Sequence, residues 1–295
     1  MSPMPEDPRI LAPALTPRER KGGLDFGAAF EQVDFLSRAQ VHGIALFTPL
    51  GEYPAFSLED RGRLLYLAAK RSRVPVYSAI GAFTLDDSLT LAREARRADA
   101  AGVLLPPPYF FRYQQPELCE FYSQFARQLG GGVPVYLADT PDFTTPLEPE
   151  TVRAVLLSGQ FAGIAAPACA PTVAGVPVAW ISTVDACLTA ARRAGSQGAL
   201  SNAACAVPEL VVALNRALLA GNEIKSAELE KLLIEFDEWV RQFPFPVALK
   251  AAAGLRGVKL GVQPVPLSSG RQRLLDAFCD WFKAWLPVCQ KTVKG

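Results

Sequence analysis

Two residue types that often carry catalysis are scarce in this sequence. It contains one histidine, His42, and no lysine between Lys70 and Lys225. Metal sites built on imidazole, and serine or cysteine nucleophiles activated by histidine, both need a histidine at the site. His42 precedes an apolar run at residues 44–47, which places it at the start of a predicted strand. We therefore expect His42 to occupy a helix-terminal or buried structural position, and we expect no metal and no cofactor.

Long apolar segments and blocks of a single charge are also missing. No apolar run reaches the roughly 18 residues of a membrane span, and the start, MSPMPEDPRI, has no segment of signal-peptide type. Thirty basic and 29 acidic residues give a net charge of +1, without a basic block suited to nucleic acid. The six cysteines include no close CxxC pair, which is typical of reduced thiols. These features predict a cytoplasmic protein that binds neither nucleic acid nor membrane.

The sequence contains a repeated alternation of short apolar runs and longer amphipathic segments. The first run lies at residues 10–15 and the eighth at residues 198–201. Near-continuous apolar strands that alternate with helices indicate a parallel sheet covered on both faces. Eight such units within about 210 residues predict a closed (β/α)8 barrel. An open doubly wound sheet is the alternative, but its dinucleotide-binding form would carry a GxGxxG motif after the first strand, which is absent.

Only helical patterns follow the eighth unit. They cover residues 227–243, 247–255 and 271–285, and the last has one broad apolar face. We expect this face to pack on the barrel. The sequence therefore predicts a single structural unit, with the barrel in residues 1–222 and a C-terminal helical extension in residues 223–295.

Several units carry motifs beyond this periodicity. GIALFTPLGEYPAFSLEDR (residues 43–61) and VLLPPPYFF (residues 103–111) resemble the second and fourth units of the dihydrodipicolinate synthase / N-acetylneuraminate lyase family. That family has a Gly-Thr-Thr-Gly-Glu loop in the second unit and a Pro-Tyr-Tyr turn in the fourth. VPVYLADTP (residues 133–141) resembles its fifth strand, and FAGIA (residues 161–165) its sixth. The order and spacing of these motifs resemble that family from about residue 9 to residue 287.

The resemblance implies a barrel in which a lysine forms a Schiff base with pyruvate or a related keto acid. In such sites a tyrosine relays protons and an arginine holds the substrate carboxylate. At the matching positions here the lysine is replaced by Ala165, the fifth-strand tyrosine by Ala138, two relay threonines by Pro49 and Leu50, the second tyrosine of the turn by Phe110, and the arginine by Phe143.

These replacements share a direction, because polar side chains have become apolar. Strands three to eight lie inside the lysine-free interval, so no Schiff base can form on them. The pattern favours a catalytically degenerate relative, a pseudoenzyme that binds a small ligand or serves as a structural or regulatory subunit. The alternative is a lyase or aldolase of the same family that acts on a keto acid without a Schiff base, through Glu52, Tyr109 or Tyr136.

The resemblance also implies where a ligand and a second subunit would lie. The implied ligand is a small organic acid, and the implied assembly is a homodimer or homotetramer with the aromatic turn PYFFRY (residues 108–113) near a subunit contact. The side chains that we expect at the ligand are Glu52, Tyr109, Tyr136, Phe143, Thr183 and Ser201.

The loop after the fifth strand contains two carboxylates, Asp139 and Asp142. If Ala138 faces the barrel interior, strand alternation points Asp139 towards the helices, where we expect it to cap the loop. Cys169 has no basic neighbour and is predicted to be a small packing residue.

The interior near Ala165 is expected to be filled or apolar. Large voids are costly in protein interiors, so Tyr136, Leu50 and Phe143 are predicted to crowd the space that the missing polar groups leave. We expect no buried cation within salt-bridge reach of Ala165.

Overall fold

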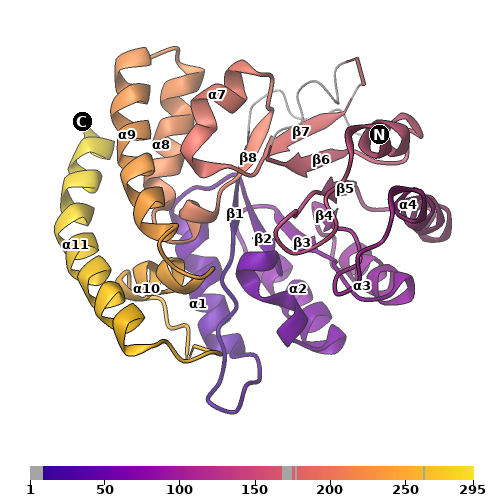
Figure 1. Ribbon diagram of the computed structural model, residues 1–295, viewed down its shortest axis with the longest axis horizontal. Coiled ribbons are helices and arrows are strands. Elements are labelled where there is room, and N and C mark those ends of the chain that lie inside the picture. Colours follow the sequence, from indigo (N-terminus) through magenta and orange to yellow (C-terminus); the bar gives the residue numbers. More distant parts are fainter. Residues whose placement is uncertain (1–8, 168–174, 177, 262) are drawn as a thin grey trace.

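Eight parallel strands close into a barrel in their order along the chain. A computed structural model describes residues 9–167, 175–176, 178–261 and 263–295. Figure 1 shows the strands at the centre, with the helices around them. The strands are β1 (Arg9–Pro13), β2 (Gly43–Leu46), β3 (Val76–Ala79), β4 (Gly102–Leu105), β5 (Val135–Ala138), β6 (Gly163–Ala166), β7 (Ala179–Ser182) and β8 (Gly198–Leu200). The predicted (β/α)8 barrel is confirmed.

The helices that follow β1, β2 and β3 begin at residues suited to capping. Asp25, Ser57 and Thr84 each accept a hydrogen bond from a backbone N–H of the first helical turn. The helices are α1 (Phe26–Arg38), α2 (Leu58–Arg71), α3 (Leu85–Arg97), α4 (Gln115–Leu129), α5 (Pro149–Leu157), α7 (Leu188–Arg193) and α8 (Pro208–Leu219). Short 3₁₀ turns follow three strands: η1 (Pro49–Gly51) and η2 (Tyr53–Ala55) after β2, η3 (Asp185–Cys187) after β7, and η4 (Asn202–Cys205) after β8.

The C-terminal extension consists of α9 (Glu223–Val240), α10 (Val247–Leu255) and α11 (Ser269–Lys294). In Figure 1, α11 curves along the outer side of α9 and α10. The prediction that the last helix ends near residue 285 is wrong, because α11 continues through Pro287. A proline inside a helix removes one backbone donor. The apolar face nevertheless continues beyond it, where Cys289 is fully buried.

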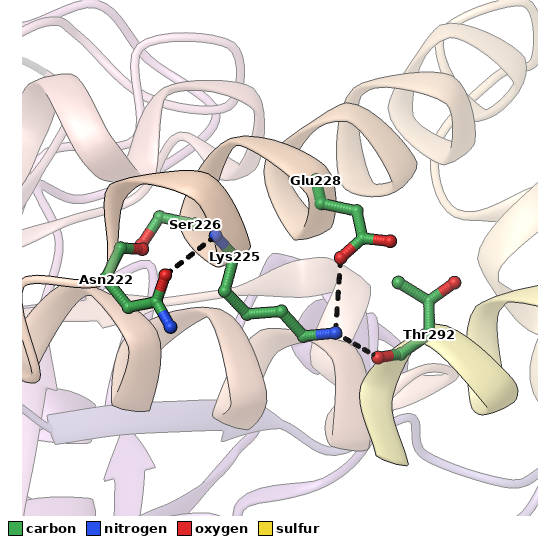
Figure 2. Close-up of polar contacts among 5 residues, drawn as sticks. All are labelled: Asn222, Lys225, Ser226, Glu228 and Thr292. Atoms are coloured by element: carbon green, nitrogen blue, oxygen red, sulfur yellow. Dashed lines mark hydrogen bonds and ion pairs between the residues drawn. The ribbon is translucent and has the colours of Figure 1, made fainter. Parts of the chain in front are cut away.

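A polar contact ties the end of α11 to the start of α9 (Figure 2). The Asn222 side chain accepts a hydrogen bond from the Lys225 backbone N–H at 3.0 Å, which caps α9. Lys225 Nζ donates to the Thr292 carbonyl oxygen and pairs with Glu228 Oε2 at 3.2 Å. A cation is favourable at a helix carboxyl end because it meets the unpaired carbonyls there.

None of the helices in the described part of the chain combines the length and the apolar character that a bilayer span needs.

The buried side chains form two clusters that the strands separate. The outer cluster lies between strands and helices and includes Leu137 and Ile164. The inner cluster fills the barrel and includes Tyr136, Ala138 and Ala165. Successive residues of β5 therefore alternate between the two clusters, as the period of a strand requires and as the sequence predicted.

Candidate ligand-binding site

The barrel interior is closed at the level where β5 and β6 end. Ala138 and Ala165 are direct neighbours in the register of these two strands, and Ala165 is 1% exposed. Below them the rings of Tyr136 and Tyr77 meet edge to face, with centroids 6.4 Å apart. Gly102 leaves room for both rings, because a Cβ there would lie 3.0 Å from Tyr77 and 3.1 Å from Tyr136. Ala138 and Ala165, which the sequence motifs led us to expect at the positions of a tyrosine and a lysine, are thus adjacent in a packed apolar interior.

A pocket of about 670 Å³, which we call the mouth pocket, lies at the carboxyl ends of the strands, the mouth of the barrel. This is the end at which (β/α)8 barrels carry their active sites. The loops after β2, β5, β6 and β7 contribute to its wall, together with β8, η4 and the connection between α9 and α10. The lining residues are Thr48, Pro49, Asp139, Thr140, Pro141, Asp142, Phe143, Pro167, Thr183, Val184, Leu200, Asn202 and Phe245.

The open pocket corrects one expectation about this region. Tyr136 shares the inner cluster with Ala138 and Ala165, as predicted. Leu50 is fully buried but belongs to the outer cluster, and Phe143 lies at the pocket rim with 44% of its surface exposed. Leu50 and Phe143 therefore do not crowd the interior, and the prediction is wrong for both. The apolar character of these two residues does not predict their positions, because Leu50 packs in the outer cluster and Phe143 packs against Phe245.

Polar groups of the pocket wall come mainly from hydroxyls and carboxylates. Thr48 is 2% exposed, and its hydroxyl has no hydrogen-bond partner among the described residues. The Thr140 hydroxyl is 3.0 Å from that of Thr144. The Asp139 side chain accepts a hydrogen bond from the Leu147 N–H at 3.1 Å, which confirms its predicted loop-capping contact. Burial raises the pKa of the Asp139 carboxyl, and the Leu147 N–H acts in the opposite direction.

The two cations that are buried in the described part of the chain have partners of their own. Lys250 on α10 is buried and forms an ion pair with Glu52, which follows η1. Arg61 on α2 is also buried, and it donates to the carbonyl oxygens of Gly81 at 2.9 Å and Ala79 at 3.1 Å. Neither cation lines the pocket. Glu52, which the sequence placed at a ligand, thus ties the loop after β2 to the C-terminal extension.

The other predicted site residues divide between the pocket and its surroundings. Thr183 lines the pocket, whereas Ser201 is buried beneath it and accepts a hydrogen bond from the Ala204 N–H at 3.3 Å. Tyr109 packs edge to face against Tyr53, with ring centroids 5.5 Å apart. The neighbouring Phe110 is 80% exposed. Cys169 lies outside the described residues.

His42 lies at the opposite end of the barrel strands from this pocket. Its Nδ1 accepts a hydrogen bond from the Ile10 N–H at 3.1 Å, at the amino-terminal ends of β1 and β2. His42 thus makes a structural contact between the two strands, but it is half-buried and lies directly before β2, so it is neither fully buried nor at a helix end as predicted.

Thr48, Asn202 and Phe245 are among the residues of the pocket wall that the sequence did not indicate. Thr48 directly precedes Pro49 and Leu50, which the motifs placed at the site, so its position in the sequence could have indicated that it lines the pocket. Phe245 comes from the connection between α9 and α10, and no local pattern indicates that this segment reaches the barrel mouth. Its ring lies against that of Phe143, with centroids 5.7 Å apart.

A second cavity, of about 230 Å³, lies between the barrel and the extension. Its wall includes Asp185 of η3 and Asp237 of α9. Asp185 Oδ2 accepts a hydrogen bond from the Ala203 N–H at 3.0 Å. Burial raises the pKa of Asp185 to about 6, although hydrogen bonds from Ser201 and Ala203 oppose this shift. Burial also raises the pKa of Asp237, while its ion pair with Arg241 at 2.6 Å lowers it.

Comparison with known proteins extends over nearly the whole chain. The model of the dihydrodipicolinate synthetase family matches residues 7–278. An uncharacterized DapA-like lyase of Halobacterium salinarum is 25% identical over 267 residues, which cover 88% of this chain and 87% of that protein. The 4-hydroxy-tetrahydrodipicolinate synthase 1 of Streptomyces coelicolor is 28% identical, with 88% of each chain covered.

Solved structures agree with the observed fold. The 4-hydroxy-tetrahydrodipicolinate synthase of Methylacidiphilum fumariolicum superimposes with a TM-score of 0.85 and 22% identity, over 96% of this chain and 99% of the other. At this identity the similarity supports the barrel and its C-terminal helices.

Proposed function

The chain belongs to the dihydrodipicolinate synthetase family, and from this premise we propose that it is a catalytically degenerate member. In this proposal the chain keeps the lyase barrel, does not form the Schiff base, and binds a small ligand in the mouth pocket as a homo-oligomer. The observation that carries the proposal is the adjacent pair Ala138 and Ala165 in the closed interior. An alanine side chain cannot act as nucleophile, acid or base.

The placement of the lysines supports the same conclusion. None of the eight strands contains a lysine. Lys250 is buried, but it belongs to α10 and its ammonium group is held by Glu52. Lys250 therefore lies outside the barrel strands and does not line the pocket at their carboxyl ends.

An exposed aromatic patch supports the homo-oligomer. Phe83, Phe110 and Phe111 expose 43%, 80% and 53% of their surfaces. The rings contact one another, with centroids 5.0 Å apart for Phe110 and Phe111 and 6.2 Å apart for Phe83 and Phe110. Contiguous apolar patches of this kind often mark protein interfaces. A second copy of this chain is the partner that we propose for this patch.

Borohydride trapping tests the catalytic part of this proposal. The protein is incubated with pyruvate and borohydride, and its intact mass is compared with that of the Streptomyces coelicolor synthase treated in parallel. We expect the mass of this chain to stay unchanged. A stoichiometric pyruvyl adduct would refute the proposal. Turnover of keto acids without an adduct would instead favour the lyase alternative that uses Glu52, Tyr109 or Tyr136.

Light scattering tests the assembly, with Phe110→Ser as the matched variant. The unmodified chain is expected to have the mass of a dimer or tetramer at micromolar concentration, and the variant is expected to shift towards monomer. Phe110 is chosen because its side chain contributes little to the monomer's own core. A monomeric mass for the unmodified chain would contradict the proposed homo-oligomer.

A further inference from the structure

A pocket of about 760 Å³ lies between α7, α8 and α9, which are neighbours at the side of the barrel (Figure 1). We call it the α7–α9 pocket. Gly195, Ser196 and Gln197 of its wall belong to the connection that leads into β8, so the pocket lies at the amino-terminal end of the strands. The mouth pocket lies at their carboxyl ends, and the two sites are therefore separate.

Two helices present one face each to this pocket. Residues spaced by three, four or seven positions lie on the same side of an α-helix. The lining residues of these helices have this spacing: Thr189, Arg192 and Arg193 on α7, and Glu223, Ser226, Ala227 and Glu230 on α9. The two faces therefore meet across the pocket, and they carry opposite charges.

One contact fixes the level at which these faces meet. The Thr189 N–H donates to Glu230 Oε1 at 3.0 Å. Because α7 returns from the carboxyl end of β7 and α9 runs the other way after the turn at Gly221, the two helices are antiparallel. One helical turn beyond the contact, about 5 Å along both axes, the two arginines of α7 lie opposite Ser226 and Ala227. The cations thus face two small side chains and not a carboxylate.

The charged groups of the two faces do not pair with one another. None of the ion pairs between described residues includes Arg192, Arg193, Glu223 or Glu230. Arg192 Nη1 donates to the Ser196 carbonyl oxygen at 2.9 Å, and burial lowers the pKa of Arg192 without an opposing effect from a carboxylate. Arginine at the end of α7 and glutamate at the start of α9 complement the helix dipoles, but that role does not require both charges to line one hollow.

We infer that the α7–α9 pocket binds a zwitterion in which a short chain separates a carboxylate from an ammonium group. Planar guanidinium groups bind a carboxylate through two parallel hydrogen bonds, which assigns the carboxylate to Arg192 and Arg193. Glu230 lies about one turn to one side of the arginines and Glu223 about one turn to the other, so an ammonium group about 5 Å from the carboxylate would meet a glutamate. This ligand is distinct from that of the mouth pocket, and the inference does not depend on the function proposed there.

The separation of the charges selects the length of the ligand. In an α-amino acid only one carbon atom separates the carboxylate carbon from the nitrogen, so both charges lie within about 3 Å. An ω-amino acid with three methylene groups extends over about 5 Å, which matches one helical turn. The pocket therefore fits an ω-amino acid better than an α-amino acid.

Four probes test this inference: 4-aminobutanoate, butanoate, butylammonium and glycine. Their affinities for the full chain are measured by ligand-observed NMR at low salt. We expect 4-aminobutanoate to bind at least about tenfold more tightly than butanoate or butylammonium, because it alone meets both charges of the pocket. Glycine should bind at least about threefold more weakly than 4-aminobutanoate, because its charges lie too close together. Raising the salt to about 500 mM should narrow these differences, because salt screens exposed charges.

Two double variants remove one sign of charge each. Arg192→Gln/Arg193→Gln should lower the affinity for 4-aminobutanoate about tenfold, to that of butylammonium, and Glu223→Gln/Glu230→Gln should lower it to that of butanoate. Glutamine can still make the hydrogen bonds that Arg192 and Glu230 form with the backbone, so the helices are expected to stay in place. Arg273→Gln is the matched control, because Arg273 is exposed on α11, and it should change none of the affinities.

Ala227→Leu tests the space between the two helices. Ala227 is exposed, so a leucine there should fill the hollow opposite the arginines without disturbing the core. We expect this variant to weaken the binding of 4-aminobutanoate at least about fivefold. Ala284→Leu, at an exposed position of α11, is its control and should have no effect.

Three outcomes would overturn the inference. The first is 4-aminobutanoate that binds no more tightly than butanoate and butylammonium, and the second is no detectable binding of 4-aminobutanoate at about 10 mM. The third is an affinity for 4-aminobutanoate that both double variants and Ala227→Leu leave unchanged, which would place its binding site elsewhere on the protein.

Discussion

Two carboxylates, one half-buried and one buried, lie where the barrel meets its C-terminal extension, and their surroundings differ. Glu52, beside η1, meets the ammonium group of Lys250 on α10. Asp185, in η3, faces a cavity whose wall contains a second carboxylate, Asp237 of α9. Burial raises the pKa of Asp185 to about 6. One junction is thus closed by opposite charges, whereas the other brings like charges together.

This difference shows that the two junctions have separate physical roles. The Glu52–Lys250 pair neutralises both charges and fixes the loop after β2 against α10. The Asp185 carboxyl is stabilised by the Ala203 N–H but carries a desolvation cost when it is ionised. We therefore expect the first junction to contribute to stability at neutral pH and the second to reduce it.

The largest expected effect comes from breaking the first junction. Lys250→Met removes the cation but keeps a flexible apolar side chain, and leaves Glu52 partly buried without its partner. Removing one member of a buried pair typically costs about 3 to 5 kcal/mol of unfolding free energy. The side chains of Lys250 and Glu52 are 4% and 16% exposed, which supports a value near this range. Chemical denaturation at pH 7.5 measures the change.

The double variant Lys250→Met/Glu52→Gln is the control for this prediction. It removes both charges, so it is expected to be less destabilised than Lys250→Met alone. If the double variant were as unstable as the single one, the loss would reflect packing of the lysine chain and not an unpaired charge.

The next effect, of opposite sign, comes from Asp185→Asn at the second junction. A folded-state pKa of about 6, above the usual value near 4, means that the folded protein binds the proton more readily than the unfolded chain. The contribution of Asp185 to stability is therefore greatest below about pH 4, falls as the pH rises to about 6, and is constant above it. Asparagine does not ionise, so it avoids this loss of stability. The free energy of unfolding of the variant should exceed that of the unmodified protein by roughly 2 to 3 kcal/mol near pH 7.5 and should match it near pH 4.

Denaturation of both proteins across this pH range tests the sign directly. Asparagine can still accept the hydrogen bond from the Ala203 N–H, so the neutral forms of the two proteins are closely matched. A stability difference that does not change between pH 4 and pH 7.5 would show that ionisation of Asp185 is not its cause.

The sequence predicted the strands and helices on either side of these junctions better than the side-chain contacts between them. The alternating apolar runs predicted the barrel, and the alternation in β5 predicted that Tyr136 and Ala138 face inward. The Glu52–Lys250 pair joins residues that are 198 positions apart, and no periodicity indicates which carboxylate meets which cation. The open mouth was missed for a related reason, because Phe143 packs against Phe245 from a distant connection.

The smallest effect concerns Arg241, which pairs with Asp237 and so moderates the like charges at the second junction. The Arg241 side chain is 65% exposed, and solvent screens its interaction with the 18% exposed Asp237. Arg241→Gln is therefore expected to reduce the unfolding free energy at pH 7.5 by only about 0.5 kcal/mol. Its pair lowers the pKa of Asp237, and this contribution disappears when Asp237 is protonated at low pH.

Repeating the Arg241→Gln substitution in the Asp185→Asn protein completes the comparison. Without the charge of Asp185, the repulsion on Asp237 is weaker, so Arg241 has less charge to offset. The effect of Arg241→Gln should then be smaller than in the unmodified protein, and a double-mutant cycle at pH 7.5 measures the difference. Equal effects in both backgrounds would mean that Asp185 and Asp237 do not influence each other, and that the second cavity holds two independent carboxylates.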